Sequence, residues 1–442
     1  MRTGKQVKVT VVGLGKIGLP LAVQFARSGV EVIGADTNPA VVDLVNAGKE
    51  PFPGEAHLQE YLADVVSVGT LTATIDTTAA VAQSQVVVVV VPLFVDADAK
   101  PDFGWMDSAT EAIGRGLRAE NHTLVCYETT LPVGTTRTRW KPTLEQVSGL
   151  VAGRDFHLVF SPERVLTGRV FADLRRYPKL IGGLDAAGAD RARAFYEQVL
   201  QFDERPDLER GNGVWDLGSA EAAEMAKLAE TTYRDVNIGL ANQFARFAAA
   251  NGIDVHQVIE ASNSQPYSHI HLPGMSVGGH CIPVYPRLYL WNDPQATVVR
   301  AARAANADMP AYTVGLAAEL AGGLAGKRVA VLGASYRGGV KETAFSGVFP
   351  AVAEVTRLGG VALVHDPMYT DAELEKLGFT AYHLGDPVDI VLVHTNHADY
   401  ADTTAADFPG VSVLVDGRSI MTEGAFPGVA VRVVGKPAPE GN

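Results

Sequence analysis

The sequence has little of several features that would define its class at once. It has two cysteines, Cys126 and Cys281, far apart in its 442 residues, so we expect no disulfide framework and a reducing compartment. No uninterrupted apolar run approaches the ~20 residues that a membrane helix needs. The basic residues 1–5 precede an apolar segment that glycines and a lysine interrupt, which is unlike a signal peptide. We therefore expect a cytoplasmic protein.

Positive charge is also scarce. The 37 Lys and Arg residues face 50 Asp and Glu residues, which gives a net charge of −13 and argues against nucleic acid as a partner. Cys and His residues do not cluster at metal-binding spacings, so we expect no metal site. The remaining composition, 47% hydrophobic, is typical of a globular protein, and the length suggests two or three domains.

The N-terminal segment alternates strand, turn, helix and strand. A β-branched strand at 7–12 runs into Gly13-Leu14-Gly15-Lys16-Ile17-Gly18, and a helix at 19–28 and a strand at 30–35 follow. The first two glycines let a pyrophosphate approach the helix N-terminus, and Gly18 permits close helix packing. Asp36, at the end of the second strand, can accept both ribose hydroxyls and would repel a 2′-phosphate. This unit predicts a dinucleotide site that prefers NAD.

Polar loops follow three further strands, which we expect at residues 85–91, 123–127 and 156–160. Pro92 ends the first strand, residues 128–134 follow the second, and Ser161-Pro162-Glu163-Arg164-Val165-Leu166 follows the third. Glu163 and Arg164 could be an ordinary surface ion pair. Their position favours a functional role, because open α/β sheets bind ligands at the carboxyl ends of their strands.

A long helix is expected from Ser219 to about Ala250. Its apolar residues are broadly compatible with a buried stripe: Leu228, Ile238, Leu240, Phe244 and Phe247. Lys227 and Arg234 lie two helical turns apart, with Thr231 between them on the same face. Alone, Lys227 would be interpreted as a solvated residue. Long helices that join two α/β regions often pack against a partner subunit, which favours a homodimer or higher homo-oligomer.

The second half repeats the α/β pattern without the dinucleotide fingerprint. We expect helices at 296–324 and 347–358, and strands at 328–332, 361–365, 390–393 and 411–415. Together the two halves predict an α/β fold with two Rossmann-like, doubly wound parallel sheets, joined by a long central helix and a helical dimerisation region. The Pro- and Gly-rich tail from Lys436 to Asn442 is expected to be disordered.

Between the halves lies the stretch from Pro273 to Pro283, in which Gly278-Gly279-His280 precedes Cys281. Glycines allow backbone amides to approach a ligand closely, and prolines stiffen the chain. A thiol held there is either a nucleophile or a small buried side chain, and the stretch alone does not decide between them.

Together, the motifs resemble the nucleotide-sugar 6-dehydrogenases, the group of UDP-glucose, UDP-N-acetylhexosamine and GDP-mannose dehydrogenases. The matching segments are residues 13–18, 129–134, 161–166, 233–238, 278–283 and Asp416-Gly417-Arg418. The resemblance implies an NAD-binding domain at 1–210, a central helical dimerisation domain with the cysteine loop at 211–322, a UDP-sugar-binding domain at 323–436 and a tail at 437–442. Substrate is expected between the two sheets.

The resemblance also implies a double oxidation of a sugar C6 alcohol to a carboxylate with two NAD. Lys227 with a water, and Thr130, would serve as the base for the alcohol proton and the donors to the developing oxyanion. Cys281 would bind the aldehyde covalently, and Glu163 would help water to hydrolyse the thioester. The implied cofactor-binding residues are Gly13, Gly15, Lys16, Ile17, Gly18, Asp36, Pro92 and Thr130. The implied substrate-binding residues are Arg164, Val165, Lys227, Thr231, Arg234, Gly278, Tyr336, Arg337 and Arg418.

The sequence departs from the family pattern at several places. Thr231 replaces an asparagine, Tyr285 replaces an aspartate and Ala344 replaces an arginine. Arg164 and Val165 replace the Phe-Leu of UDP-glucose enzymes, which points to UDP-N-acetylhexosamines and above all UDP-N-acetylmannosamine. The His and Arg that this subgroup has before its Pro-Gly segment are here Gln265 and Tyr267, and this difference points away from that subgroup.

Three functional hypotheses therefore follow. The first is an active UDP-sugar 6-dehydrogenase, with two NADH formed for each substrate. The second is a variant that acts on UDP-glucose or an unusual nucleotide sugar and can stop at the aldehyde, for which Thr231 and Tyr285 are the motive. The third is a nucleotide-sugar-binding protein without turnover. The retention of Cys281, Lys227, Glu163 and Thr130 disfavours the third reading.

Overall fold

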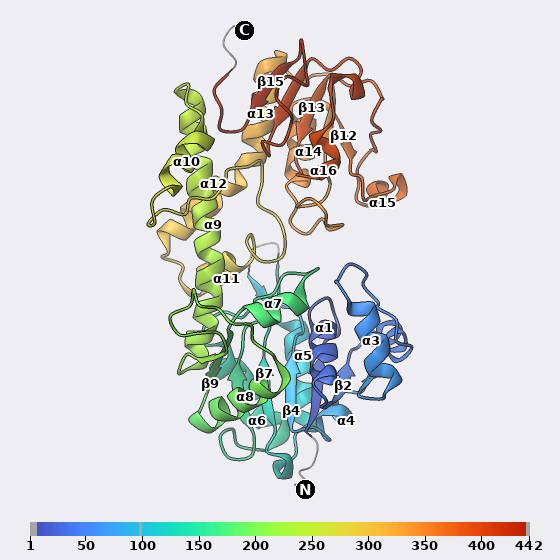
Figure 1. Ribbon diagram of the computed structural model, residues 1–442, viewed down its shortest axis with the longest axis vertical. Helices are drawn as coiled ribbons and strands as arrows, with labels where there is room; N and C mark the ends of the chain where they lie inside the picture. The colour runs from blue at the N-terminus through green and yellow to red at the C-terminus, as the bar shows by residue number, and fades with distance from the viewer. Residues whose placement is uncertain (1–6, 97–99, 439–442) are drawn as a thin grey trace. The chain divides into compact units, whose positions relative to one another are not determined.

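The computed structural model of the protein describes residues 7–96 and 100–438 (Figure 1). These residues form two compact units, one up to Ala229 and one from Glu230. The division falls within helix α9 (Ala220–Ala250), which the sequence predicts almost to the residue. The finer division into three domains stays a prediction, and residues 439–442 of the expected disordered tail lie outside the described part.

The N-terminal unit is built on an eight-stranded sheet with the order β10-β9-β8-β7-β4-β1-β2-β3. All neighbouring strands are parallel except β8 and β9. The strands are β1 (Lys8–Val12), β2 (Glu31–Ala35), β3 (Leu71–Thr74), β4 (Val86–Val89), β7 (Leu124–Tyr127), β8 (His157–Phe160), β9 (Lys179–Gly183) and β10 (Val214–Asp216). The valine-rich central strands are buried on both faces, as helix-covered parallel strands must be.

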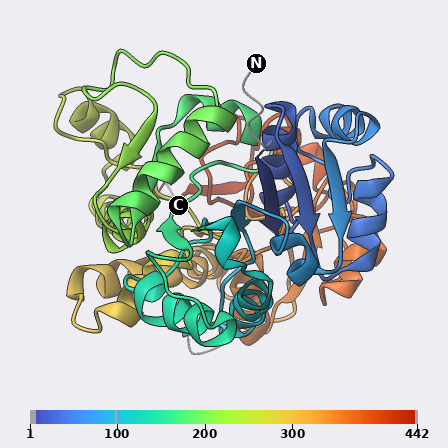
Figure 2. The same cartoon turned by 90° about the horizontal axis from the view of Figure 1, so that it is seen from below.

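Helices cover both faces of this sheet, as the view from below shows for the blue and cyan elements (Figure 2). The helices are α1 (Gly18–Arg27), α2 (Pro39–Asn46), α3 (Leu58–Ser67), α4 (Thr77–Val81), α5 (Gly104–Gly116), α6 (Lys141–Ser148), α7 (Val170–Arg176) and α8 (Ala186–Val199). The main core joins the strands to α1, α3, α7 and α8. A small hairpin of β5 (Phe94–Val95) and β6 (Pro101–Asp102) and a π-helical turn (Thr136–Trp140) complete the unit.

The C-terminal unit contains a five-stranded parallel sheet with the order β12-β11-β13-β14-β15. The strands are β11 (Arg328–Leu332), β12 (Val361–His365), β13 (Ile390–Val393), β14 (Val413–Asp416) and β15 (Ala430–Val433). Its helices after α9 are α10 (Val255–Asn263), α11 (Tyr285–Asn292), α12 (Thr297–Ala307), α13 (Met309–Ala321), α14 (Val348–Arg357), α15 (Asp371–Lys376) and α16 (Ala398–Ala401). The expected α/β fold with two Rossmann-like sheets is confirmed.

Two details of the helical prediction were wrong. The single helix expected at 296–324 is two helices, which meet at Asp308. Pro310 explains the break, because it lacks an N–H and is tolerated in the first turn of a helix but not in its interior.

The second error concerns the buried stripe of α9. Leu228 is fully buried, but Leu240, Phe244 and Phe247 are 46%, 37% and 65% exposed. The helix packs instead through small residues, since Ala241, Ala245 and Ala248 join the core that contains Val255, Ile259 and Met309.

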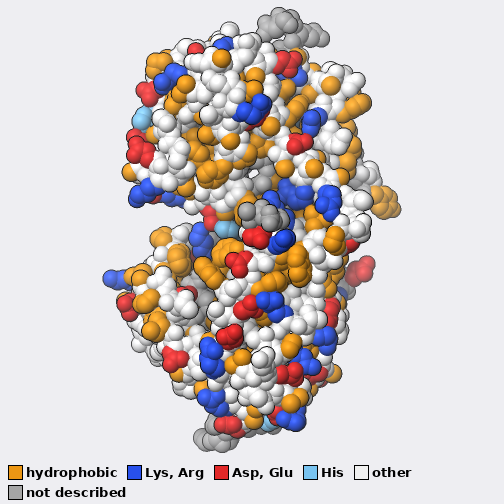
Figure 3. Space-filling view, turned by 180° about the vertical axis from the view of Figure 1, so that it is seen from behind, with side chains coloured by type: hydrophobic (Ala, Val, Ile, Leu, Met, Phe, Trp, Pro, Cys, Tyr) orange, Lys and Arg blue, Asp and Glu red, His pale blue; other side chains and the backbone are white. Residues whose placement is uncertain are grey.

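The surface carries both signs of charge. On the face shown in Figure 3, acidic and basic side chains are interspersed rather than gathered into one patch. Among the described residues, no helix has both the length and the apolar character that crossing a bilayer requires.

Candidate active site

The glycines of the turn after β1 have separate structural tasks. Gly13 has a φ of +94°, and a Cβ there would lie 3.1 Å from the carbonyl of Val90. A Cβ on Gly18 would lie 1.9 Å from the Gly13 oxygen, so this position needs glycine for packing. At Gly15, in contrast, a Cβ would meet nothing within 4 Å, which leaves open space beside the backbone where a phosphate can approach.

The remaining cofactor candidates surround this turn. The carboxylate of Asp36 accepts hydrogen bonds from the N–H of Leu14 at 2.8 Å and of Asn38 at 2.9 Å, which fixes it beside the turn. Lys16 and Pro92 are exposed and Ile17 is half-buried. The residues present fit a dinucleotide with free ribose hydroxyls.

The loop that carries Thr130 is fastened to α9. Thr130 is 4% exposed, and the loop beyond it donates to Glu224 of α9 from the N–H of Gly134 at 2.5 Å, and from the N–H and hydroxyl of Thr136 at 2.9 and 2.7 Å. Burial raises the pKa of Glu224 to about 7 against these hydrogen bonds. Because Lys227 lies one turn further along α9, one helical segment holds both Lys227 and the Thr130 loop.

Glu163 belongs to a buried charge cluster. Lys179 on β9 donates from Nζ to Glu163 Oε2 and to Glu128 Oε2, each at 2.9 Å, and its side chain is 4% exposed. Tyr196 donates its hydroxyl proton to the other oxygen of Glu128. The N–H of Arg164 donates to Glu163 Oε1 at 2.7 Å. The Glu163 carboxylate is therefore held in one orientation.

The two carboxyls of this cluster titrate in opposite directions. Burial raises the pKa of Glu128 to about 7, although the Lys179 ammonium opposes the rise. Burial also acts on Glu163, but the charge and hydrogen bond of Lys179 and the charge of Lys227 outweigh it and lower its pKa. One ammonium thus keeps Glu163 ionised while Glu128 retains a proton more readily.

Lys227 is buried rather than solvated, at 6% exposure, and its charge acts on Glu163. The structure therefore brings these two predicted residues together in the N-terminal unit. Arg164 is half-buried, with its Nη1 at 3.5 Å from the Pro178 oxygen, and Val165 packs against the main core.

In the C-terminal unit, the cysteine loop runs along the carboxyl edge of the sheet. Met275 donates its N–H to the Gly417 oxygen beyond β14 at 2.9 Å, and Gly279 donates to the Ala344 oxygen at 2.8 Å. A Cβ on Gly278 would lie 2.5 Å from the Cβ of Tyr336, so the loop needs glycine for this close approach. The position where the family has arginine, Ala344, is thus a backbone support of the loop.

Cys281 itself is half-buried and free of disulfide bonding. Its carbonyl oxygen accepts hydrogen bonds from the N–H of Val284 at 3.2 Å and of Tyr285 at 2.9 Å, and Tyr285 is the first residue of α11. His280 contacts Glu342 through Nε2 and Oε1 at 2.6 Å. The thiol therefore lies on a loop that is anchored on both sides.

Arg418 braces the same loop. It donates from Nε to the His394 oxygen at 2.6 Å, from Nη1 to the Ser276 oxygen at 3.3 Å and from Nη2 to Ser276 Oγ at 3.1 Å. His394 Nε2 lies 2.9 Å from Ser276 Oγ, and burial with the nearby Arg418 charge lowers the pKa of His394 to about 3. The imidazole is therefore neutral, and the guanidinium retains two N–H groups for a ligand.

A polar chain ties the loop to α9. Asp235 pairs with Arg303 at 3.1 Å and accepts a 2.8 Å hydrogen bond from Asn306. Asn242 donates to Asn306 Oδ1 at 2.8 Å and accepts from the N–H of Gly274 at 2.9 Å. These contacts fix the entry to the cysteine loop.

The other predicted substrate residues of the C-terminal unit differ in exposure. Thr231 is 2% exposed, whereas Arg234 and Arg337 are exposed. Tyr336 is half-buried, and Arg337 donates from Nε to its hydroxyl at 3.3 Å.

Comparisons with known proteins agree with this architecture. Residues 7–200 match the NAD binding domain of the UDP-glucose/GDP-mannose dehydrogenase family, and residues 221–308 match its central domain. The chain is 33% identical over 428 residues to UDP-N-acetyl-D-mannosamine dehydrogenase of Pyrococcus horikoshii, covering 94% of this chain and 96% of the relative. It is 31% identical over 413 residues to the enzyme of that name from Campylobacter jejuni, covering 89% and 96%.

Solved structures show the same fold. The P. horikoshii UDP-D-ManNAc dehydrogenase aligns with a TM-score of 0.86 at 31% identity, over 97% of this chain and 99% of the other. A UDP-glucose dehydrogenase of Pyrobaculum islandicum aligns with a TM-score of 0.86 at 26% identity, over 99% of each chain.

The cofactor turn and these likenesses define an NAD-dependent dehydrogenase of UDP-sugars. The chain belongs to the UDP-glucose/GDP-mannose dehydrogenase family, as its motifs predicted, and NAD is its cofactor. The motifs did not reveal Glu128, Lys179, Glu224, Ser276 and His394, which hold the predicted residues in place. Glu128, Lys179 and His394 lie at strand ends, Ser276 lies in the cysteine stretch and Glu224 lies in the first turns of α9, but sequence alone gives no sign of their partners.

The geometry at Gly15 and Gly18 predicts that alanine impairs cofactor binding at the first position and stability at the second. Gly15→Ala should leave the melting temperature unchanged and raise the KM for NAD by about tenfold, because its methyl occupies the open space. Gly18→Ala should lower stability by about 1–3 kcal/mol, because its methyl collides with Gly13. Thermal unfolding and NAD kinetics on both variants test this. Equal destabilisation by the two variants would contradict the assignment.

The Lys179 bridge predicts a pH-dependent loss of stability. Lys179→Met should lower the free energy of unfolding by about 3–5 kcal/mol near pH 8, because it leaves buried carboxylates without a cation. Both carboxyl pKa values should then rise in the folded state, so the loss should shrink towards pH 5 as protons neutralise them.

Urea unfolding at the two pH values measures this loss. Lys8→Met is the matched control, because it removes a surface pair with Glu31 that is 23% and 45% exposed and should cost less than about 1 kcal/mol. An equal loss for Lys179→Met at both pH values would refute the bridge.

Proposed function

We propose that the protein oxidises the C6 hydroxyl of a UDP-N-acetylhexosamine, above all UDP-N-acetylmannosamine, to the carboxylate. The observation that carries this proposal is the full-length similarity to enzymes named UDP-N-acetyl-D-mannosamine dehydrogenase. Arg164 and Val165, which replace the Phe-Leu of UDP-glucose enzymes, support it. The free thiols Cys126 and Cys281 fit a cytoplasmic location.

In the first oxidation, a water that Lys227 orients accepts the hydroxyl proton, and Thr130 donates to the developing oxyanion. Bound NAD supplies the hydride acceptor for both oxidations. The burial of Lys227 and Thr130 excludes bulk water, which strengthens their interactions with a developing charge. Glu224 keeps the Thr130 loop on the helix that carries Lys227.

In the second oxidation, the Cys281 thiolate adds to the aldehyde carbon and gives a thiohemiacetal. Loss of a second hydride gives a thioester, and water then cleaves its C–S bond and releases the thiolate. Glu163, held ionised by Lys179, orients that water. The balance is one alcohol, two NAD and one water, converted to one carboxylate, two NADH and three protons.

Substrate recognition is assigned to arginines. Arg164, Arg234, Arg337 and Arg418 suit a diphosphate, because guanidinium groups form paired, charge-assisted hydrogen bonds with it. Arg418 uses part of its donor set on Ser276 and His394, so it contributes at most two N–H groups to a ligand.

A second candidate function is a variant that releases the aldehyde. Thr231 and Tyr285 favour it, because they replace an amide and a carboxylate of the family pattern. Tyr285 begins α11 just after the cysteine loop, so the missing carboxylate is local to the thiol.

NADH stoichiometry tests the proposal. Incubation with limiting UDP-N-acetylmannosamine should yield two NADH per sugar, and UDP-glucose, UDP-N-acetylglucosamine and GDP-mannose should react more slowly. Cys281→Ser should abolish formation of the acid, because serine leaves no thioester. Mass spectrometry identifies the product: one NADH with released aldehyde would instead establish the second candidate.

We also propose that the chain forms a homo-oligomer through α9. Leu240, Phe244 and Phe247 lie on one exposed side of this helix, together with Tyr233 at 54% exposure. An apolar face of this kind, continuous along a long helix, is typical of a surface that a second copy covers.

Substitution on this face tests the oligomer. Phe247→Asp should shift the protein to monomers in sedimentation equilibrium at micromolar concentration, because burying a carboxylate costs several kcal/mol. Val68→Asp, at a similarly exposed apolar residue (72%) at the end of α3, should leave the assembly intact. A monomeric wild type would disprove the proposal.

A further inference from the structure

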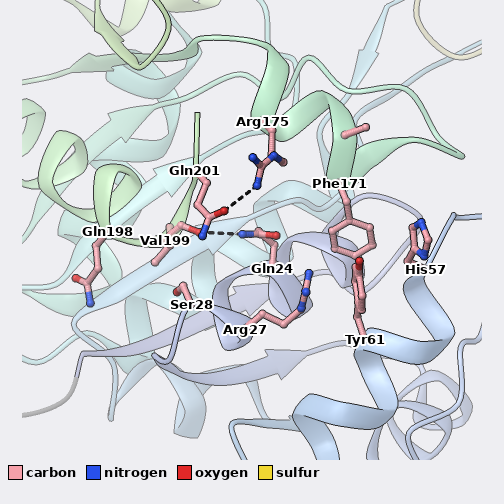
Figure 4. Close-up of a pocket in the computed structure, with 11 residues that line it drawn as sticks. Gln24, Arg27, Ser28, His57, Tyr61, Phe171, Arg175, Gln198, Val199 and Gln201 are labelled. Atoms are coloured by element: carbon pink, nitrogen blue, oxygen red, sulfur yellow. Dashed lines mark hydrogen bonds between the residues drawn. The ribbon is translucent and has the colours of Figure 1, made fainter. Parts of the chain in front are cut away.

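The N-terminal unit holds a cavity of about 550 Å³ that the dehydrogenase chemistry does not use (Figure 4). It lies at the C-terminal end of α1, at the start of α3, along α7 and at the end of α8. None of the fingerprint glycines lines it, nor does Asp36. Since the fingerprint lies at the N-terminal end of α1, the cavity is separate from the cofactor turn.

The charged side chains in the wall of the cavity are two arginines. Arg27, Arg175 and His57 line it, and no Asp or Glu is among its lining residues. In a chain with a net charge of −13, a concave site without a carboxylate in its wall concentrates positive potential. Glu60, at 3.9 Å from His57, and Asp203, which pairs with Arg175, are the neighbouring acids.

Arg27 is held in position while its charge is not neutralised. Its guanidinium lies over the ring of Tyr61 at 3.5 Å, and His57 stacks on Tyr61 with 5.5 Å between centroids. Tyr61 and Phe171 also pack edge to face, with 5.1 Å between their ring centroids. Among residues 7–96 and 100–438, no carboxylate forms an ion pair with Arg27. Cation–π stacking fixes the side chain but leaves its N–H donors available.

Arg175 is fixed from the opposite wall. It donates to Asp203 Oδ1 at 2.6 Å and to Gln201 Oε1 at 2.7 Å. Gln24, which donates to the Val199 oxygen at 3.1 Å, lies between Arg175 and Arg27 in the wall (Figure 4). Two oriented guanidinium groups and two amides therefore surround one space.

We propose that this cavity is a second ligand site, which binds a metabolite that carries a phosphate or diphosphate group. Guanidinium groups recognise phosphate oxygens through paired hydrogen bonds, and the amides suit the ester oxygens and hydroxyls beside them. The volume lies in the range of small-molecule sites. The site is independent of the proposed sugar chemistry.

Calorimetric titration of the NAD-saturated protein with inorganic pyrophosphate tests the site. Arg27→Gln should weaken binding by about tenfold or more, because it removes the guanidinium that no acid neutralises. Gln198→Glu, which adds a carboxylate to the wall, should weaken it similarly. The matched control is Arg176→Gln, the next residue of α7, which does not line the cavity and should have no effect.

Substitution of a proposed substrate-binding arginine distinguishes this cavity from the substrate site. Arg418→Gln should leave this pyrophosphate binding unchanged, and Arg27→Gln should leave the KM for UDP-sugar and NAD unchanged. Binding that Arg418→Gln abolishes and Arg27→Gln preserves would overturn the second site, as would no binding at millimolar pyrophosphate. Neither outcome bears on the dehydrogenase activity, which NADH formation measures separately.

Discussion

The buried polar side of α9 is the constraint on which the candidate site depends. Glu224, Thr231, Asp235 and Asn242 follow one another at intervals of seven, four and seven residues, so they share one face of the helix. Three of them have identified tasks: Glu224 binds the Thr130 loop, and Asp235 and Asn242 hold the entry to the cysteine loop. Each is buried, and an unpaired polar group there would cost about 1–3 kcal/mol. The hydrogen bonds of these buried side chains of α9 are therefore satisfied only when the loops are correctly placed.

In each unit, one cation also organises the residues around it. Lys179 joins Glu128 to Glu163 across the strands of the first sheet, and Arg418 joins Ser276 to His394 at the edge of the second. The consequences differ. Lys179 is an ammonium between two carboxylates and sets their pKa values, whereas Arg418 donates to neutral oxygens and organises a loop. Lys179 therefore sets the protonation of its two carboxyl neighbours, whereas Arg418 sets the conformation of the cysteine loop.

The sequence predicted the sheets and the motif loops because their signals are local. Valine runs identify central strands, and Gly18 is required by its contact with the nearby Gly13. The sequence could not predict which distant residues pair with one another. Lys179 and Glu128 lie 51 residues apart, and Ser276 and His394 lie 118 residues apart. Pairing at such separations is decided by sheet order and helix phase, which composition and spacing do not determine.

The same limit explains the error at α9. A stripe of large apolar residues normally marks the side of a helix that faces the core. Here that side is exposed in the chain, because alanines such as Ala241 and Ala245 pack internally and polar residues fill the rest of the inner face. Small residues allow neighbouring helices and loops to approach closely enough for Asn242 to bond with Gly274 and Asn306. Larger core side chains would separate them, so the helix can organise the cysteine loop only if its large apolar residues point outwards. The exposed apolar face of α9 thus follows from the packing of its small residues against the core, and it is the surface that the proposed homo-oligomer would bury.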